Sequence, residues 1–364
     1  MQGFPRTWCS RTRRSGLSRH SGQPTGKGLP ASPVWGLAGW TGTVPRYWRC
    51  ARSLPRPPVP TIRRRDPAHE DGREQAVTDT LGKLLDLLDL EQIELDIFRG
   101  RSPDDRRQRV FGGQVAGQAL VAAGRTVPAD RPVHSLHAYF IRPGDPAVPL
   151  VYIVDRVRDG RSFTTRRVSV IQHGKVIFTL SASFHHAEPG PDHSAPMPQA
   201  PPPESVPPHA ERLEKVFGRE AAKYFRDNPI DLRFVGPLSV EAQRDPSLRT
   251  DQSLVWLRAD GDMPDDPLLH VCLMTYASDM TLLDSILLRH GLSWADGSTT
   301  GASLDHAMWF HRPFRVDRWL LYAQESPSAT GARGLARGQV FTQEGHLVVS
   351  VVQEGLIRTA PKPS

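Results

Sequence analysis

The chain carries several side chains that could act as nucleophiles, bases or metal ligands. Four histidines suggest a general base or a metal site: His134, His137, His306 and His311. None of the four forms the His-x3-His pair with a nearby acid that marks a helical zinc site, so we interpret them as structural. Cys272 stands in no nucleophile motif, and the sequence has no Gly-x-Ser-x-Gly elbow. The residues alone therefore predict no metal site and disfavour covalent catalysis.

Positive charge is concentrated at the N-terminus. The 364 residues have a net charge of +7, whereas residues 1–76 hold 14 Lys or Arg and four acids, a net charge of +10. The rest therefore carries −3, so the overall excess does not indicate a nucleic-acid partner. Cys272 is the single cysteine after residue 50, which fits a reducing compartment. No apolar run approaches the ~20 residues of a membrane helix, so no membrane span is expected.

Residues 1–76 show no sustained periodicity and mix arginine runs with proline-rich pieces, a composition typical of disorder. Two interpretations compete. The stretch resembles a mitochondrial transit peptide, because it is rich in Arg and free of acids before Asp66. Alternatively it precedes the true start: the excess of Arg over Lys indicates GC-rich coding, where GTG starts are common, and Val77 lies directly before the first regular pattern. We favour the second interpretation and, with it, a bacterial cytoplasmic protein.

The chemistry needs elements to position it, and from Thr78 the sequence reads as two similar halves. In the first half, residues 110–124 are rich in small side chains and predict a helix that a sheet can wrap closely. Strand-like runs then follow at 134–141, 148–157, 162–172 and 175–185. Asp159–Gly160 and His173–Gly174 supply hairpin turns between the last three runs.

The second half repeats this order. A helical pattern from Asp279 to Leu288 precedes strand-like runs at 303–311, 319–325, 334–343 and 346–353. The pair Arg142–Pro143 aligns with Arg312–Pro313, which indicates an internal duplication of about 170 residues. We therefore predict an α+β fold with two helix-wrapping antiparallel sheets joined edge to edge into one extended sheet.

A proline-rich segment separates the halves. Nine prolines lie between residues 188 and 209, and such a density fixes φ and removes backbone donors. We predict an extended linker over 188–212, a first domain over 77–187 and a second over 213–360.

Five sequence blocks resemble the acyl-CoA thioesterase II family of bacteria and its peroxisomal relatives. They are RQRVFGGQVAGQAL at 107–120, HSLHAYFIRPG at 134–144, YASDM at 276–280, DHAMWFHRP at 305–313 and VQEGLIR at 352–358. The resemblance implies a double hotdog, in which each of two curved sheets wraps a helix. It also implies a cofactor-free enzyme that hydrolyses fatty acyl-CoA to free acid and CoA, and a homo-oligomer.

The same resemblance implies three catalytic residues in the second half. They are Asp279 of the Tyr-Ala-Ser-Asp block, Ser303 two residues before the Asp-His pair, and Gln353 of Val-Gln-Glu-Gly. In the family such a trio activates a water against the thioester carbonyl. Ser303 replaces the Thr of many relatives, keeping the hydroxyl but losing the methyl that stiffens χ1. We expect Asp279 at the start of a helix, whose free N–H groups could receive the oxyanion.

Gln114 aligns with Asp279, and an amide offers no basicity, so we expect the corresponding site of the first half to be chemically idle. Further residues are predicted to bind acyl chain or CoA: Gly112, Gly113, Gln114, Arg312 and Arg333. Two alternatives remain. The chain could bind acyl-CoA without hydrolysing it, or it could be a hydratase of the same fold, although Gln114 stands where such an enzyme needs an acid.

Overall fold

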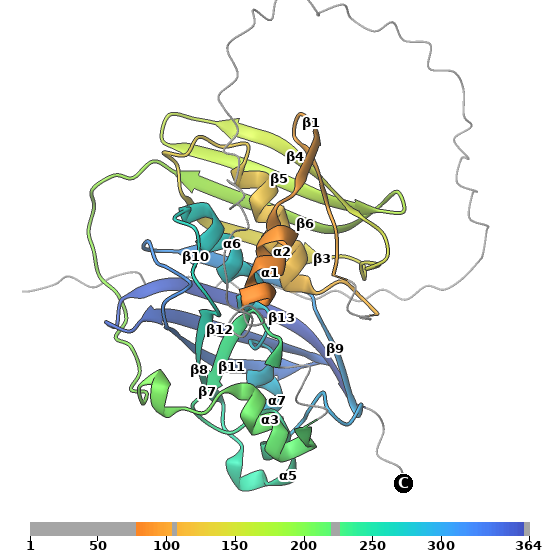
Figure 1. Cartoon of the computed structure of the whole chain (residues 1–364), viewed down its shortest axis with the longest axis vertical. Helices are drawn as coiled ribbons and strands as arrows, with labels where there is room; N and C mark the ends of the chain where they lie inside the picture. Colours follow the sequence, from red (N-terminus) through yellow and green to blue (C-terminus); the bar gives the residue numbers. More distant parts are fainter. Residues whose placement is uncertain (1–77, 104–107, 220–225, 360–364) are drawn as a thin grey trace, which may run out of the picture. The chain divides into compact units, whose positions relative to one another are not determined.

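The computed structural model describes residues 78–103, 108–219 and 226–359, in which thirteen strands form one antiparallel sheet (Figure 1). The first half contributes β1 (Glu91–Glu94), β2 (Ile97–Gly100), β3 (Val133–Phe140), β4 (Leu150–Asp159), β5 (Phe163–Gln172) and β6 (Lys175–His185). The second half contributes β7 (Ile230–Phe234), β8 (Gln252–Ala259), β9 (Thr299–Ser303), β10 (Asp305–Phe310), β11 (Leu320–Thr330), β12 (Arg333–Thr342) and β13 (Leu347–Thr359). Their order across the sheet is β1-β2-β4-β5-β6-β3-β10-β13-β12-β11-β8-β7, and β9 pairs with β13.

This order confirms the predicted double hotdog. The two halves meet where β3 pairs with β10, with Tyr139 opposite Asp305 and His137 opposite Ala307. Moving outward from that pair, β6 corresponds to β13, β5 to β12 and β4 to β11. The duplicated sheets are therefore joined edge to edge through a continuous hydrogen-bonded ladder.

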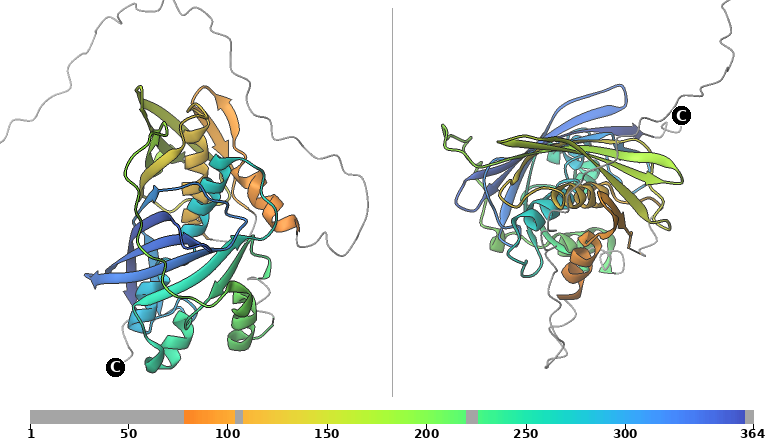
Figure 2. Two further views of the ribbon diagram at one scale, coloured as in Figure 1. Left: turned by 90° about the vertical axis from the view of Figure 1, so that its left-hand side faces the viewer. Right: turned by 90° about the horizontal axis from the view of Figure 1, so that it is seen from above.

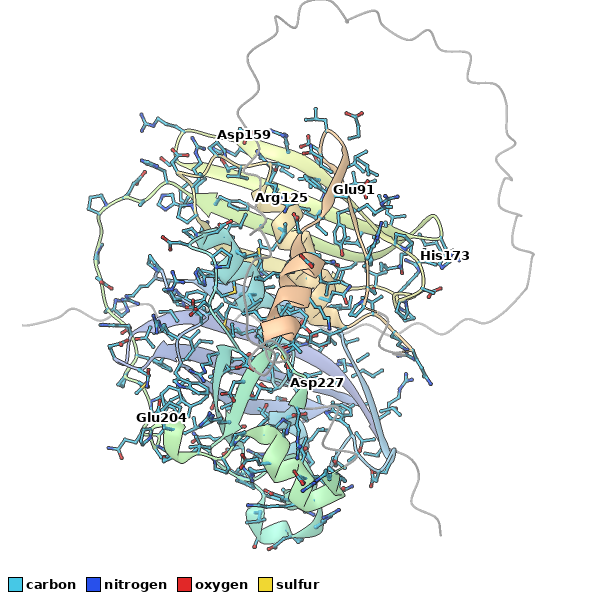
Figure 3. The ribbon with its side chains drawn as sticks, in the orientation of Figure 1. Glu91, Arg125, Asp159, His173, Glu204 and Asp227 are labelled. Atoms are coloured by element: carbon cyan, nitrogen blue, oxygen red, sulfur yellow. The ribbon has the colours of Figure 1, made fainter. Side chains whose placement is uncertain are left out.

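The His173–Gly174 turn has the backbone that its sequence favours, whereas residues 160–162 join β4 to β5 in place of the predicted Asp159–Gly160 turn. His173 and Gly174 between β5 and β6 have φ of 49° and 67°, and Gly345 between β12 and β13 has φ of 88°. Positive φ at both central residues matches the right-handed twist of the flanking strands. Asp159 is the last residue of β4, and His173 follows the last residue of β5 (Figure 3).

Helices lie inside the curve of the sheet (Figure 2). The helices are α1 (Thr78–Leu88), α2 (Gly112–Gly124), α3 (His209–Phe217), α5 (Ser239–Arg244), α6 (Pro267–Ser278) and α7 (Asp284–His290), and two short 3-10 helices are η1 (Pro203–Ser205) and η2 (Pro246–Leu248). The small residues of α2 let it approach α6 closely: a Cβ added at Gly117 would lie 3.1 Å from the Cys272 carbonyl oxygen. Ala119 and Leu120 on α2 are fully buried.

The predicted helix from Asp279 to Leu288 is wrong in its start, because Asp279 to Leu283 form turns between α6 and α7. The preceding helix α6 was not predicted. Its Asp266 side chain accepts hydrogen bonds from the N–H groups of Leu268 and Leu269, and Pro267 occupies the first helical position. Most of α6 is buried, so its sequence lacks the polar face that reveals a helix by its period.

The proline-rich segment is packed against the second half. Residues 188–202 form no helix or strand, but α3 begins at His209, inside the predicted linker. Trp256 Nε1 donates a 2.9 Å hydrogen bond to the Pro201 carbonyl, and Arg233 Nη1 donates one of 2.9 Å to Pro203. Met197, Ala200 and Val206 join Trp256 in a second apolar cluster with Trp319, Leu321, Phe341 and Leu347. We call residues 197–206 the strap.

The strap should contribute measurably to stability. Val206→Ala removes two methyl groups from a side chain that is 6% exposed, so we expect the free energy of unfolding to fall by about 2 kcal/mol. Val157→Ala is the matched control because Val157 on β4 is 54% exposed, and we expect a change near zero. Urea unfolding of both variants measures this. Equal effects would contradict a packed strap.

Candidate active site

The structure brings together the three residues that the family resemblance implied. Ser303 Oγ donates a 2.9 Å hydrogen bond to Asp279 Oδ1, and Gln353 Nε2 donates one of 2.6 Å to the same oxygen. Both donors therefore hydrogen-bond to the same carboxylate oxygen, Oδ1, and leave Oδ2 to other contacts. The Gln353 side chain is fully buried.

Three elements of the second half position this cluster. Asp279 follows the last residue of α6, with φ −83° and ψ −4°. It therefore lies at the C-terminal end of a helix, and our expectation that it starts a helix was wrong. Ser303 ends β9 and pairs with Gly355 of β13. Gln353 points inward because it falls on the buried side of the β13 alternation, with Val351 and Gly355.

The first half supplies the helix N-terminus that faces Asp279. A Cβ added at Gly112 would lie 2.6 Å from Asp279 Oδ2 and 2.8 Å from the Phe140 ring, and one at Gly113 would overlap the Tyr276 carbonyl oxygen. Only glycine lets α2 approach this closely. The Gly113 backbone N–H also lowers the pKa of Asp279, which places it beside the carboxylate. The helix N-terminus beside Asp279 is therefore that of α2, from the first half of the chain, and not that of a helix beginning at Asp279.

Burial dominates the electrostatics of the cluster. It raises the pKa of Asp279 above the usual value of 3.8, although His306, Gln353, Ser303 and the Gly113 N–H each act to lower it. A carboxyl with a raised pKa is a stronger base than an exposed one.

A second carboxyl, that of Asp284, lies five residues along the chain. Burial raises the pKa of Asp284 to about 6, partly offset by the indole N–H of Trp294, which donates to Asp284 Oδ1 at 2.7 Å. Asp284 has no hydrogen bond to Ser303 or Gln353 among the described contacts. It is therefore a useful reference carboxyl outside the cluster.

Gln114 faces away from this cluster. Its Nε2 donates to the Arg101 carbonyl at 3.0 Å and to Ser102 Oγ at 3.1 Å. Gln118 completes the network, because its Nε2 donates to the Leu87 carbonyl at 2.7 Å and its Oε1 accepts from the Tyr152 hydroxyl at 2.6 Å. The corresponding place in the first half is thus filled by amides that bond to protein groups.

The two arginines predicted to bind substrate lie apart from each other. Arg312 follows the C-terminal end of β10, whereas Ser303 precedes its N-terminal end. Arg312 forms an ion pair with Asp192 and donates a 2.8 Å hydrogen bond to the Leu347 carbonyl. Arg333 at the start of β12 donates to Glu354 at 2.9 Å, and its side chain is 50% exposed. Arg312 therefore links the proline-rich segment to the second half through Asp192. The Arg333 guanidinium is half exposed and lies beside Glu354, the residue after Gln353.

His306 was grouped in the sequence with structural histidines, yet it lies beside the cluster. Its Nε2 is 2.8 Å from Ser278 Oγ, and its side chain is buried. Asp279 and Gln353 both act to raise the pKa of His306, but burial lowers it and prevails. The Asp305-His306 pair begins two residues after Ser303, but that spacing alone does not separate His306 from the other three histidines.

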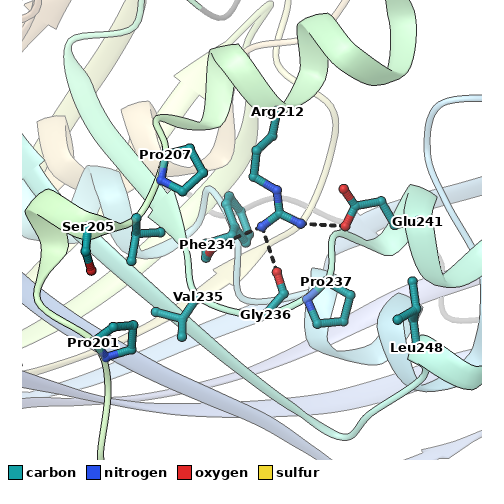
Figure 4. A pocket seen from close by; sticks show the side chains of 11 residues that line it. Pro201, Ser205, Pro207, Arg212, Phe234, Val235, Gly236, Pro237, Glu241 and Leu248 are labelled. Atoms are coloured by element: carbon teal, nitrogen blue, oxygen red, sulfur yellow. Dashed lines mark hydrogen bonds and ion pairs between the residues drawn. The ribbon is translucent and has the colours of Figure 1, made fainter.

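A pocket of about 460 Å³ lies elsewhere, between the strap and β7 (Figure 4). Arg212 within it donates to the carbonyls of Phe234 and Gly236 and to the Glu241 carboxylate. Its charge is thus satisfied by the protein, and the pocket contains none of the cluster residues.

In the described part of the chain, no helix is long and apolar enough to cross a membrane, and no three acidic, Cys or His side chains converge as a metal site.

Known proteins resemble this chain along most of its length. Family models described as "Acyl-CoA thioesterase" and "Acyl-CoA thioesterase N-terminal domain" match residues 241–356 and 102–185. Human acyl-coenzyme A thioesterase 8 is 42% identical over 295 residues, covering 76% of this chain and 89% of the human protein. Acyl-CoA thioesterase 2 of Haemophilus influenzae is 38% identical over 289 residues, covering 78% and 99%. The crystal structure of acyl-CoA thioesterase II TesB2 from Mycobacterium marinum matches with a TM-score of 0.64 and 45% identity, over 77% of this chain and all of that one.

Proposed function

Since the chain belongs to the acyl-CoA thioesterase family, we propose that it hydrolyses fatty acyl-CoA at one site per chain, built on Asp279, Ser303 and Gln353. The observation that carries this proposal is that two side-chain donors hydrogen-bond to one oxygen of the buried Asp279 carboxylate. That arrangement fixes the carboxylate and leaves Oδ2 directed at the N-terminus of α2. Thioester hydrolysis needs a fixed base and donors for the oxyanion; the Gly113 N–H bonds to the carboxylate, and we propose its neighbours at the start of α2 as the oxyanion donors.

The reaction follows from these positions. Asp279 Oδ2 takes a proton from a water as the water oxygen bonds to the thioester carbonyl carbon. The carbonyl oxygen gains negative charge, which the N–H groups at the start of α2 stabilise. When the carbonyl re-forms, the carbon–sulfur bond breaks and the CoA sulfur takes the proton from Asp279. Ser303 and Gln353 keep the carboxylate oriented throughout. Because water attacks the carbonyl carbon directly, no covalent intermediate with the enzyme is needed.

The N-terminal half contributes a helix end but no base. Gln114 stands where the acid would be, and its amide is bonded to the Arg101 carbonyl and Ser102. We therefore propose that this half supports acyl-CoA binding through Gly112 and Gly113, while hydrolysis takes place at Asp279. Arg333 is the arginine that we propose to meet a CoA phosphate.

The experiment that tests the function is an acyl-CoA hydrolysis assay. The purified full chain is supplied with acyl-CoAs of increasing chain length, and a thiol-trapping reagent measures the CoA released. We expect turnover with at least one chain length. Binding of acyl-CoA by calorimetry without release of CoA at any length would favour the alternative, a non-catalytic acyl-CoA-binding protein.

The pH dependence of kcat/KM should reflect the ionisation of the Asp279 carboxyl. A base must be ionised to accept a proton, so kcat/KM should fall as the pH is lowered through the raised pKa of Asp279. We expect the midpoint of this fall above the ordinary value of 3.8. Rates measured between about pH 4 and 9 give the profile.

Asp284→Asn supplies the control for this profile, because burial raises the pKa of Asp284 to about 6, within the same range. The acid limb should persist in that variant. Its disappearance would assign the limb to Asp284 and contradict the proposed base.

A homo-oligomer and a cytoplasmic location are also proposed, on the family resemblance and the sequence composition. Light scattering of the purified protein tests the first, and cell fractionation tests the second.

A further inference from the structure

His306 and Gln353 are buried neighbours on adjacent strands, because the residues next to them, Ala307 of β10 and Val352 of β13, are paired in the sheet. Ser278 Oγ lies 2.8 Å from His306 Nε2 and 3.0 Å from the Thr275 carbonyl oxygen. Gln353 Nε2 donates to Asp279 Oδ1 at 2.6 Å. Ser278, His306 and Gln353 are each at most 1% exposed, so bulk water does not satisfy their polar atoms.

Two atoms of these side chains have no hydrogen-bond partner among the described residues. They are His306 Nδ1 and Gln353 Oε1, and both are buried. A buried polar atom left unpaired costs about 1–3 kcal/mol. One atom is a nitrogen that can carry a proton and the other is an acceptor, so a single hydrogen bond between the two side chains would satisfy both.

The tautomer of His306 decides whether that bond forms. With the proton on Nε2, the ring donates to Ser278, and the unprotonated Nδ1 has nothing to give Gln353 Oε1. With the proton on Nδ1, the ring donates to Gln353 Oε1, and Nε2 accepts from the Ser278 hydroxyl. This second arrangement pairs both His306 ring nitrogens and Gln353 Oε1, and it turns the single Ser278 hydroxyl proton from the Thr275 carbonyl oxygen to His306 Nε2.

We propose that His306, in the tautomer protonated on Nδ1, is a positioning residue that holds the Gln353 amide with its NH2 group on Asp279 Oδ1. This inference rests on the proposed function, since it concerns the same base. If the amide were reversed, Gln353 Oε1 would oppose Asp279 Oδ1, two acceptors face to face. His306 thereby determines that Oδ1 is loaded and that Oδ2 is the oxygen that accepts the proton.

Two substitutions separate the roles of the ring nitrogens. His306→Asn places an amide nitrogen near the Nδ1 position and keeps a donor toward Gln353. His306→Gln places its amide near the Nε2 position and keeps a partner for Ser278, but it leaves Gln353 Oε1 unpaired. We expect His306→Gln to lower kcat by about 10–100-fold with KM unchanged, the usual effect of losing an orienting partner, and His306→Asn to retain most of kcat.

The pH profile adds a readout that a merely structural role would not move. A hydrogen bond to a carboxylate lowers its pKa, so a misaligned Gln353 should move the acid limb of kcat/KM to higher pH in His306→Gln but not in His306→Asn. Thermal melting of each variant shows that the fold is intact. Equal kcat values and equal acid limbs in the two variants would overturn the inference.

Two further measurements keep the test decisive. If either variant fails to fold, 15N NMR of the wild-type enzyme labelled at histidine reports the tautomer directly, and a proton on Nε2 would overturn the proposal. Asp279→Asn tests the proposed function separately. An inactive Asp279→Asn with indistinguishable His306 variants would sink the positioning role alone, whereas an active Asp279→Asn would sink the base assignment.

Discussion

Asp279→Asn is expected to lower kcat by about 10²–10⁴-fold, the range associated with a positioned general base. An amide of nearly the same shape fills the place of the carboxylate but cannot accept the proton of the attacking water. KM should change little, because the substituted atom acts on the water and not on the acyl-CoA. Steady-state kinetics with the best acyl-CoA substrate measures both parameters.

Asp284→Asn is the matched control for that variant. It makes the same chemical change five residues away, at a carboxyl whose pKa burial also raises, to about 6, but whose hydrogen bond goes to Trp294. We expect its kcat to stay within about threefold of the wild type, as for an ordinary substitution outside the site. A loss in Asp284→Asn equal to that in Asp279→Asn would mean that charge in this region, and not one particular base, supports catalysis.

Gly113→Ala is expected to be the most disruptive single-methyl addition in the described part of the chain. Its Cβ would overlap the backbone carbonyl oxygen of Tyr276, and it would crowd the Phe111 ring, which packs edge-on against Tyr276 at 5.1 Å. A backbone atom cannot move aside as a flexible side chain does, so α2 must shift away from α6. We expect the free energy of unfolding to fall by about 1–3 kcal/mol, and kcat to fall as well because α2 carries the proposed oxyanion donors.

Gly82→Ala controls for the substitution itself. Gly82 lies within α1, and a Cβ there would have no atom within 4 Å. Since alanine favours a helix over glycine by about 0.5–1 kcal/mol, this variant should be slightly more stable than the wild type. Urea unfolding of both variants makes the comparison. Similar stabilities for the two variants would show that α2 and α6 are not in close contact at Gly113.

The sequence predicted the parts of the fold that depend on local chemistry. The His173–Gly174 turn fixed one hairpin, and alternation gave the strands on both sides of it. The helix α6 was missed because burial on nearly all sides removes its period. The strap lies in the predicted extended linker, and its packing was not predicted, since nothing in a run of prolines reveals that Trp256 will donate to the carbonyl of Pro201.

The candidate site was predicted less completely, for a related reason. Asp279, Ser303 and Gln353 follow from the family motifs, and the structure places them in contact. The approach of Gly112 to Asp279 joins residues from different halves of the chain, and no local pattern encodes it. His306 could not be distinguished from the other histidines by spacing, because its meaning comes from Ser278 and Gln353, which are distant in sequence.

The two halves meet at the ladder between β3 and β10, and because they belong to one polypeptide they are also covalently tethered. If the halves were separate subunits, α2 would meet Asp279 only at protein concentrations above their dissociation constant. Within one chain the effective concentration of each half for the other is fixed by the tether, on the order of millimolar for a short flexible one. The contact between α2 and Asp279 therefore does not depend on protein concentration, and we expect the specific activity of the proposed site to stay constant on dilution.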